Sequence, residues 1–296
     1  MSPINSTYKA RDVEETLDIY FYRPFGYLIA LFAKVIGLTP NIVTFLGMMF
    51  GIIAGHLFYY NSFNLDIIGI ILLILSEALD SADGQLARMT GKYSKVGRIL
   101  DGVATNFIFI SIYVHISLRI INTGTTELIF IVAILSGISH SLQSAIADFY
   151  RNLYLMIVHK KGELESIENI IENYKKLTWK TNFFEKLFIR LYINYTKEQN
   201  ALTKPALELI KIIENKYSSS LPQSFIDEYR KKMKPFLKYH NILTTNTRMI
   251  FLIISILINN ISLFFIFEII VLNILLIYVI LMQNKLCKNL SLSLVK

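Results

Sequence analysis

Blocks of about 20 apolar residues limit the fold of this chain more than any other feature. A run of that length is long enough to cross a bilayer as a helix, and the sequence contains several that are rich in Ile, Leu and Phe. Of the 296 residues 53% are hydrophobic, whereas soluble domains usually contain about 45–50% apolar residues. The chain is therefore predicted to be an all-α polytopic membrane protein rather than a protein with a single soluble core.

Six transmembrane helices are predicted, at residues 41–60, 64–88, 97–120, 127–157, 249–264 and 266–283. The triplet Thr39-Pro40-Asn41 is expected to cap and open the first of them. Residues 25–37 are apolar but short, and they carry Lys34. This segment follows Pro24, which breaks a preceding helix, and it is predicted to be an amphipathic helix lying in the membrane interface.

The composition divides the chain into four segments. Residues 1–40 form a predicted N-terminal cytoplasmic and interfacial segment, and residues 41–158 contain the first four spans. Residues 159–247 are rich in Lys, Glu and Asn, with apolar residues at helical spacing, and they predict a cytoplasmic helical insert. Residues 248–296 hold the last two spans and a cytoplasmic tail.

The placement of basic residues predicts the orientation in the membrane. The connections near 61–64, 121–127 and 259–262 contain no Lys or Arg, whereas residues 88–98 and the C-terminal tail contain several. Because cytoplasmic loops are enriched in Lys and Arg, both termini and the 88–98 loop are expected in the cytoplasm. Arg119, near the outer end of the third span, is the one exception. The net charge of +8 has the same explanation, and with no nucleic-acid module in the sequence no nucleic-acid partner is expected.

Three aspartates lie where two neighbouring spans reach the cytoplasmic side. Asp80 and Asp83 are one helical turn apart at the inner end of the second span, and Asp101 is at the inner end of the third. A charged side chain near the bilayer centre costs about 2.5–3.5 kcal/mol on insertion scales, and three carboxylates close together also repel. A bound cation resolves both problems, and an all-oxygen ligand set favours Mg²⁺ or Mn²⁺.

The order and spacing of residues 80–101 resemble a known signature. Asp80-x2-Asp83-Gly84-x2-Ala87-Arg88-x8-Gly97-x3-Asp101 resembles the motif of the CDP-alcohol phosphotransferase (phosphatidyltransferase) family. The resemblance implies a six-span fold, usually a homodimer, that binds a CDP-linked donor and releases CMP. It implies that Asp80, Asp83 and Asp101 hold the metal and that Gly84, Ala87, Arg88 and Gly97 border the nucleotide. Asn41 and Thr44, in a Pro-Asn-x-x-Thr stretch, resemble a family element near the donor site.

One position departs from the family pattern. The motif ends in a fourth aspartate, proposed as the base, where this chain has Thr105 followed by Asn106. Neither side chain is a general base at neutral pH. Three interpretations remain open. Metal coordination acidifies the acceptor, another carboxylate such as Asp101 or Glu77 takes the proton, or the protein binds the donor with weak or no turnover.

These observations lead to two hypotheses and disfavour a third. The first is transfer of a phosphoalcohol group in phospholipid biosynthesis, from CDP-diacylglycerol to a polar alcohol or from a soluble CDP-alcohol to diacylglycerol. The second is a CDP-binding membrane scaffold or regulator without catalysis. A transporter would place charged or broken segments near the bilayer midplane, whereas these aspartates lie near the cytoplasmic ends.

Other polar residues in or near the spans have simpler explanations. No pair among His56, His115 and His140 has metal-ligand spacing in the sequence, so satisfied polar contacts are expected. Asp148 and Arg151, at the inner end of the fourth span, either hold an acceptor phosphate or form an ion pair at a helix end.

Overall fold

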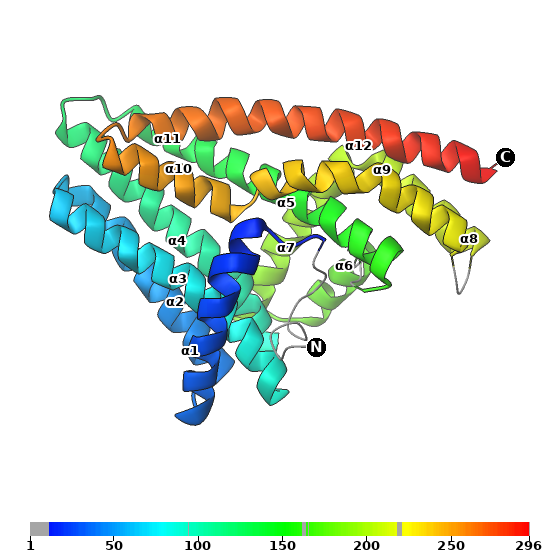
Figure 1. The fold of residues 1–296 in the computed structure, drawn as a ribbon, viewed down its shortest axis with the longest axis horizontal. Coiled ribbons are helices and arrows are strands. Elements are labelled where there is room, and N and C mark those ends of the chain that lie inside the picture. Colours follow the sequence, from blue (N-terminus) through cyan, green and yellow to red (C-terminus); the bar gives the residue numbers. More distant parts are fainter. Residues whose placement is uncertain (1–11, 94, 162–163, 165, 218–220, 296) are drawn as a thin grey trace. The chain divides into compact units, whose positions relative to one another are not determined.

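The computed structural model describes residues 12–93, 95–161, 164, 166–217 and 221–295 (Figure 1). For residues 95, 96, 98, 99, 101, 102, 184, 188 and 295 it describes the backbone only. The described residues form helices and no strands, which confirms the all-α prediction for this part of the chain.

The helices follow one another with short connections. They are α1 (Arg23–Val35), α2 (Pro40–Leu57), α3 (Phe63–Thr90), α4 (Lys95–Asn122), α5 (Ile129–His159), α6 (Ile167–Lys176), α7 (Phe183–Leu202), α8 (Lys204–Lys216), α9 (Gln223–Ile242), α10 (Thr245–Leu257), α11 (Ser262–Ile266) and α12 (Leu272–Val295). Short π-helical segments, η2 (Asp18–Tyr22) and η4 (Phe267–Val271), precede α1 and α12, and a 3₁₀ turn, η3 (Phe58–Tyr60), follows α2.

Four helical stretches of the described chain are long and apolar enough to cross a membrane. They are Pro40–Tyr60, Val103–Asn122, Ile129–His159 and Ser262–Leu294. The other two predicted spans fall on helices of a different kind. α3 has 28 residues but carries acidic side chains along its length, and α10 has only 13 residues.

The local signals for helix ends are partly confirmed. Thr39 caps α2, because its hydroxyl accepts a hydrogen bond from the Ile42 backbone N–H at 3.4 Å, and Pro40 occupies the first turn. The predicted end of the fifth span at residue 264 is wrong. α10 ends at Leu257, and Asn259 adopts a left-handed backbone conformation with φ of 53°. Asn tolerates that conformation better than most residues, so the chain turns there.

The chain divides into two compact units. The first contains Met1–Gly137 and Met249–Phe267, and the second contains Ile138–Arg248 and Glu268–Lys296. In the first unit α2 packs against both α3 and α4, and α1 packs along α3 (Figure 1). The apolar core of this unit draws on α2, α3, α4, α10 and α11.

A row of glycines on α2 allows this close packing. Gly47, Gly51 and Gly55 recur every fourth residue and are buried. A Cβ atom on Gly47 would lie 3.2 Å from Leu79 Cβ on α3, and one on Gly51 would lie 2.5 Å from Ile108 Cγ1 on α4. Small residues at four-residue spacing let helix backbones approach closely within membranes. The row therefore sets how near α2 lies to both of its neighbours.

The Gly55→Ala variant is expected to unfold more readily than wild type. A Cβ atom on Gly55 would lie 2.9 Å from the Ile112 backbone nitrogen, so α2 and α4 would have to separate. Overpacking of this kind costs about 1–3 kcal/mol. The measurement is thermal unfolding of the purified protein in detergent. The matched control is Gly137→Ala, whose Cβ atom would lie 3.9 Å from the Tyr113 ring. Equal destabilisation by the two changes would contradict this account.

Arg119 is explained by buried contacts within the first unit. Its guanidinium donates hydrogen bonds to Asp66 Oδ1 at 2.7 Å, to the Phe58 carbonyl oxygen at 3.1 Å and to Asn259 Oδ1 at 3.2 Å. Asp66 lies in the first turn of α3 and Arg119 in the last turn of α4. Arg119, which does not follow the topology pattern, therefore connects the ends of several helices through hydrogen bonds.

In the second unit, helices of the predicted insert pack on the last helix of the chain. α12 packs against α8 and α9, and α6 packs against α7. Of the apolar residues at helical spacing in this segment, Ile170, Ile213 and Tyr229 are buried, whereas Ile167 and Leu207 are only half-buried. The spacing therefore predicts part of the buried face of these helices.

A buried ionic network also lies in the second unit. Arg248 and Glu268 are fully buried and form an ion pair, with 3.1 Å between Arg248 Nε and Glu268 Oε1. Arg248 also donates to Gln143 Oε1 and to the Leu243 carbonyl oxygen, both at 2.5 Å. Gln143 in turn donates to Asn273 Oδ1 at 2.8 Å. The network joins α5, the start of α10 and the segment around η4.

Asp148 and Arg151 form an ion pair. Arg151 Nη2 lies 3.4 Å from Asp148 Oδ1, and the Tyr195 hydroxyl donates to Asp148 Oδ2 at 3.2 Å. Both oxygens of Asp148 therefore have partners on α5 and α7. This favours the ion-pair interpretation over an acceptor-phosphate site.

Candidate active site

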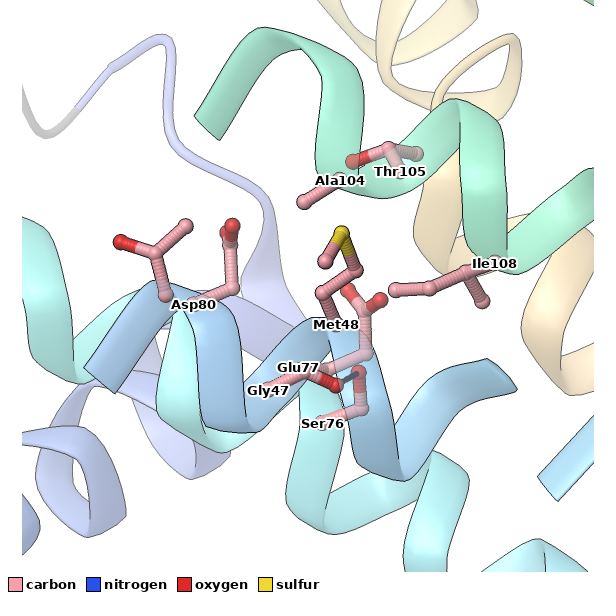
Figure 2. Close-up of a pocket in the computed structure, with 9 residues that line it drawn as sticks. Gly47, Met48, Ser76, Glu77, Asp80, Ala104, Thr105 and Ile108 are labelled. Atoms are coloured by element: carbon pink, nitrogen blue, oxygen red, sulfur yellow. Dashed lines mark hydrogen bonds between the residues drawn. The ribbon is translucent and has the colours of Figure 1, made fainter. Parts of the chain in front are cut away.

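A pocket opens between α2, α3 and α4 within the first unit (Figure 2). The pocket is small, because the space inside it that the centre of a water molecule can occupy is about 10 Å³. Its lining consists of Thr44, Gly47, Met48, Ser76, Glu77, Asp80, Ala104, Thr105 and Ile108. Residues predicted from three separate sequence stretches, namely Thr44, Asp80 and Thr105, therefore line one pocket.

Asp83 is buried and held by Thr44. The Thr44 hydroxyl donates a hydrogen bond to Asp83 Oδ2 and lies 3.1 Å from the Pro40 carbonyl oxygen. Because Thr39 and Pro40 start α2 at a defined place, Thr44 is positioned one turn into the helix, facing α3. A hydrogen bond to a carboxylate stabilises its charged form. The contact therefore joins the predicted donor-site element on α2 to the predicted metal ligand on α3.

The oxygen atoms on α3 suit a hard divalent cation. Asp80 is exposed and lines the pocket, and Asp83 is buried one turn later. Carboxylate oxygens are ligands that Mg²⁺ and Mn²⁺ prefer. The side chain of Asp101, the third predicted ligand, lies outside the described residues. Among the side chains that are described, no three His, Cys, Asp or Glu residues gather closely enough to hold a metal ion.

Arg88 covers Gly84 on the same helix. A Cβ atom on Gly84 would lie 3.5 Å from each terminal nitrogen of the Arg88 guanidinium, with no other atom nearer. Arg88 Nε is buried and has no hydrogen-bond partner among the described residues. The guanidinium thus retains donor capacity for an anionic group, as a nucleotide phosphate would require.

The N-terminal segment folds against α3 beside the pocket. Arg23 Nη2 donates to Glu14 Oε1 at 2.6 Å, and the Gln85 side chain on α3 donates to the Arg23 carbonyl oxygen at 3.0 Å. Tyr22 is buried, and burial together with the negative charge of Glu77 raises the pKa of its hydroxyl. Tyr22 is therefore a neutral hydrogen-bonding group at physiological pH.

The remaining predicted site residues occupy the same helices. Asn41 lies in the first turn of α2, Ala87 is half-buried on α3, and Gly97 lies in the first turn of α4. Thr105 is half-buried in the pocket wall, whereas Asn106 is exposed and does not line the pocket.

The family model described as CDP-alcohol phosphatidyltransferase matches residues 37–161. That stretch contains α2, α3 and α4 and every residue that lines the pocket. Residues 37–161 are thus similar to the CDP-alcohol phosphatidyltransferase family. The resemblance stated from the motif is thereby confirmed.

A curated relative matches part of this chain. The archaetidylinositol phosphate synthase of Pyrococcus horikoshii is 41% identical over 66 residues, which are 22% of this chain and 34% of that protein. The chain thus spans about a third of the length of this relative. None of the solved structures matches the chain.

Sequence patterns alone did not predict some contacts that α2 makes with α3 and α4. Ser76 donates to the Gly47 carbonyl oxygen at 2.7 Å, and both residues line the pocket (Figure 2). The glycine spacing on α2 was the available signal for this contact. His56 and His115, which have no ligand spacing in the sequence, lie with Nδ1 and Nε2 only 3.0 Å apart. No sequence signal could have paired them.

Proposed function

We propose that the chain transfers a phosphoalcohol group, either phosphatidyl or phosphoaminoalcohol, from a CDP-linked donor to an acceptor alcohol. CMP is released, and the reaction belongs to phospholipid biosynthesis. The main support for this proposal is the hydrogen bond from Thr44 to Asp83, because Thr44 lines the same pocket as Asp80 and Thr105. It brings the donor-site element of the family and its acidic motif to one place.

Each group of residues has a proposed role. Asp80, Asp83 and Asp101 hold Mg²⁺ or Mn²⁺, and a cation at that position neutralises charge on the donor's phosphates and on the departing CMP. Arg88 binds a donor phosphate or the base, while Gly84, Ala87 and Gly97 leave room for the nucleotide. Asn41 lies beside Thr44, whose hydroxyl orients the Asp83 carboxylate.

The membrane arrangement is also part of the proposal. α3 and α10 join the four apolar helical stretches as the second and fifth of six spans, with α1 at the interface. Both termini, the insert and the active site face the cytoplasm, as the distribution of Lys and Arg indicates. The protein is proposed to act as a homodimer among membrane lipids, which supply the donor or the acceptor.

The alternative is a CDP-binding scaffold or regulator that does not catalyse transfer. Thr105 favours it, because the family's fourth aspartate is replaced by a side chain that cannot act as a base. The two functions differ in one measurable respect. Both require binding of the CDP group, but only the enzyme releases CMP.

The test measures CMP released by the purified full chain with Mg²⁺ or Mn²⁺. CDP-diacylglycerol is offered with polar alcohols, including inositol phosphate because of the name of the Pyrococcus relative, and soluble CDP-alcohols are offered with diacylglycerol. We expect at least one pair to give CMP that depends on both metal and acceptor. Metal-dependent CDP binding without CMP from any pair would support the scaffold. Absence of CDP binding would refute both functions.

A further inference from the structure

A carboxylate shares the pocket with Thr105. Glu77 on α3 and Thr105 on α4 both line the space between these helices (Figure 2). Glu77 is half-buried, and its side chain rises from α3 toward α4 beside Met48 (Figure 2). The position at which the family motif has its fourth aspartate therefore lies in the same pocket as an acid from a different helix.

The other polar groups of the pocket already have roles. The Ser76 hydroxyl donates to the Gly47 carbonyl oxygen, and the Thr44 hydroxyl donates to Asp83. Asp80 belongs to the proposed metal site. Among the described residues that line the pocket, Glu77 is the one carboxylate without a role in the proposed metal site.

Glu77 and Asp80 are neighbours on the surface of α3, and both line the pocket. Residues three and four apart on a helix are neighbours on its surface, and Glu77, Asp80 and Asp83 follow one another at intervals of three. Glu77 therefore lines the pocket about one helical turn before Asp80.

We infer that Glu77 accepts the proton of the acceptor hydroxyl, in place of the aspartate that this chain lacks. The inference rests on the proposed transfer reaction. As the acceptor oxygen forms its bond to the donor phosphorus, its O–H bond breaks and the proton passes to a Glu77 carboxylate oxygen. The bond from phosphorus to the CMP oxygen breaks at the same centre, and its electron pair leaves with CMP. A positioned general base of this kind accelerates a reaction by about 10²–10⁴-fold.

The experiment compares Glu77→Gln, Thr105→Asp and the double variant. Glu77→Gln is expected to lower kcat by about 10²-fold or more and to leave the Kd for CDP unchanged. Thr105→Asp in the double variant is expected to restore most of the lost rate, because it supplies an acid from the opposite wall. In the otherwise wild-type chain, Thr105→Asp is expected to raise kcat by a much smaller factor than it does in the Glu77→Gln background. Glu228→Gln, which removes an exposed carboxylate on α9 that pairs with Lys232, is the matched control and is expected to keep wild-type rates.

Several results would overturn the inference. They are wild-type turnover in Glu77→Gln, no recovery in the double variant, and a large gain from Thr105→Asp in the otherwise wild-type chain. The rate of Thr105→Asp in the otherwise wild-type chain tests the inference even if Glu77→Gln fails to fold. Failure of the proposed function looks different, because the wild-type chain and Thr105→Asp would then both release no CMP.

Discussion

The Asp83→Asn variant is expected to release CMP on the order of 10³-fold more slowly than wild type, because several kcal/mol of charge stabilisation by the cation would be lost. Asp83 is buried beside Thr44 at the end of α3 that carries the acidic motif. Asparagine keeps the shape of this side chain and can still accept the Thr44 hydrogen bond, but it removes the negative charge. The measurements are the rate of CMP release and the binding of Mn²⁺ followed by electron paramagnetic resonance.

The matched control for this change is Asp227→Asn. Asp227 is an exposed carboxylate on α9 that pairs with Arg230 at 3.4 Å, outside the pocket. We expect this variant to keep wild-type rates and wild-type Mn²⁺ binding. If Asp83→Asn retained both properties as well, Asp83 would not be a metal ligand and the proposed site would be wrong.

The second large effect concerns stability. Glu268→Gln is expected to lower the free energy of unfolding by about 3–5 kcal/mol, because it leaves the fully buried charge of Arg248 without its counter-ion. The measurement is denaturant unfolding in detergent, with the second unit followed by protection of its backbone amides from hydrogen exchange.

A double variant separates the ion pair from the packing around it. Replacing both charges with apolar residues of similar size, Arg248→Met with Glu268→Leu, removes the unpaired charge, and such replacements are often neutral or stabilising. We expect the double variant to be more stable than Glu268→Gln alone. A double variant as unstable as the single one would show that the loss comes from Gln143 and the other partners of Arg248.

The acidic motif could be interpreted from the sequence because its geometry is local. Asp80 and Asp83 lie on one helix, and their separation fixes them on the same face. Thr39 and Pro40 likewise predict the start of α2, since a cap needs only the residues that immediately follow it. The apolar blocks predicted where helices occur but not all of their ends. A tight turn at Asn259 ended α10 earlier than the hydropathy indicated, and α12 continues to Val295, beyond the predicted end of the last span at residue 283.

Pairings between distant residues followed no local rule. The hydrogen bond from Thr44 to Asp83 joins positions 39 residues apart, and the ion pair between Arg119 and Asp66 joins positions 53 apart. Arg119 did not fit the charge pattern because its role depends on a partner that the pattern does not consider. The same is true of His56 and His115.

The sequence by itself determined that this chain is helical, that much of it suits a membrane, and which helix carries the acids of the motif. These properties follow from hydrophobicity and from spacing within single helices. Only the tertiary structure placed Glu77 in one pocket with Thr105, because the approach of α2, α3 and α4 depends on side-chain volumes such as those missing at Gly47 and Gly51. Helix packing, rather than helix formation, decides which acid faces the position of the missing aspartate.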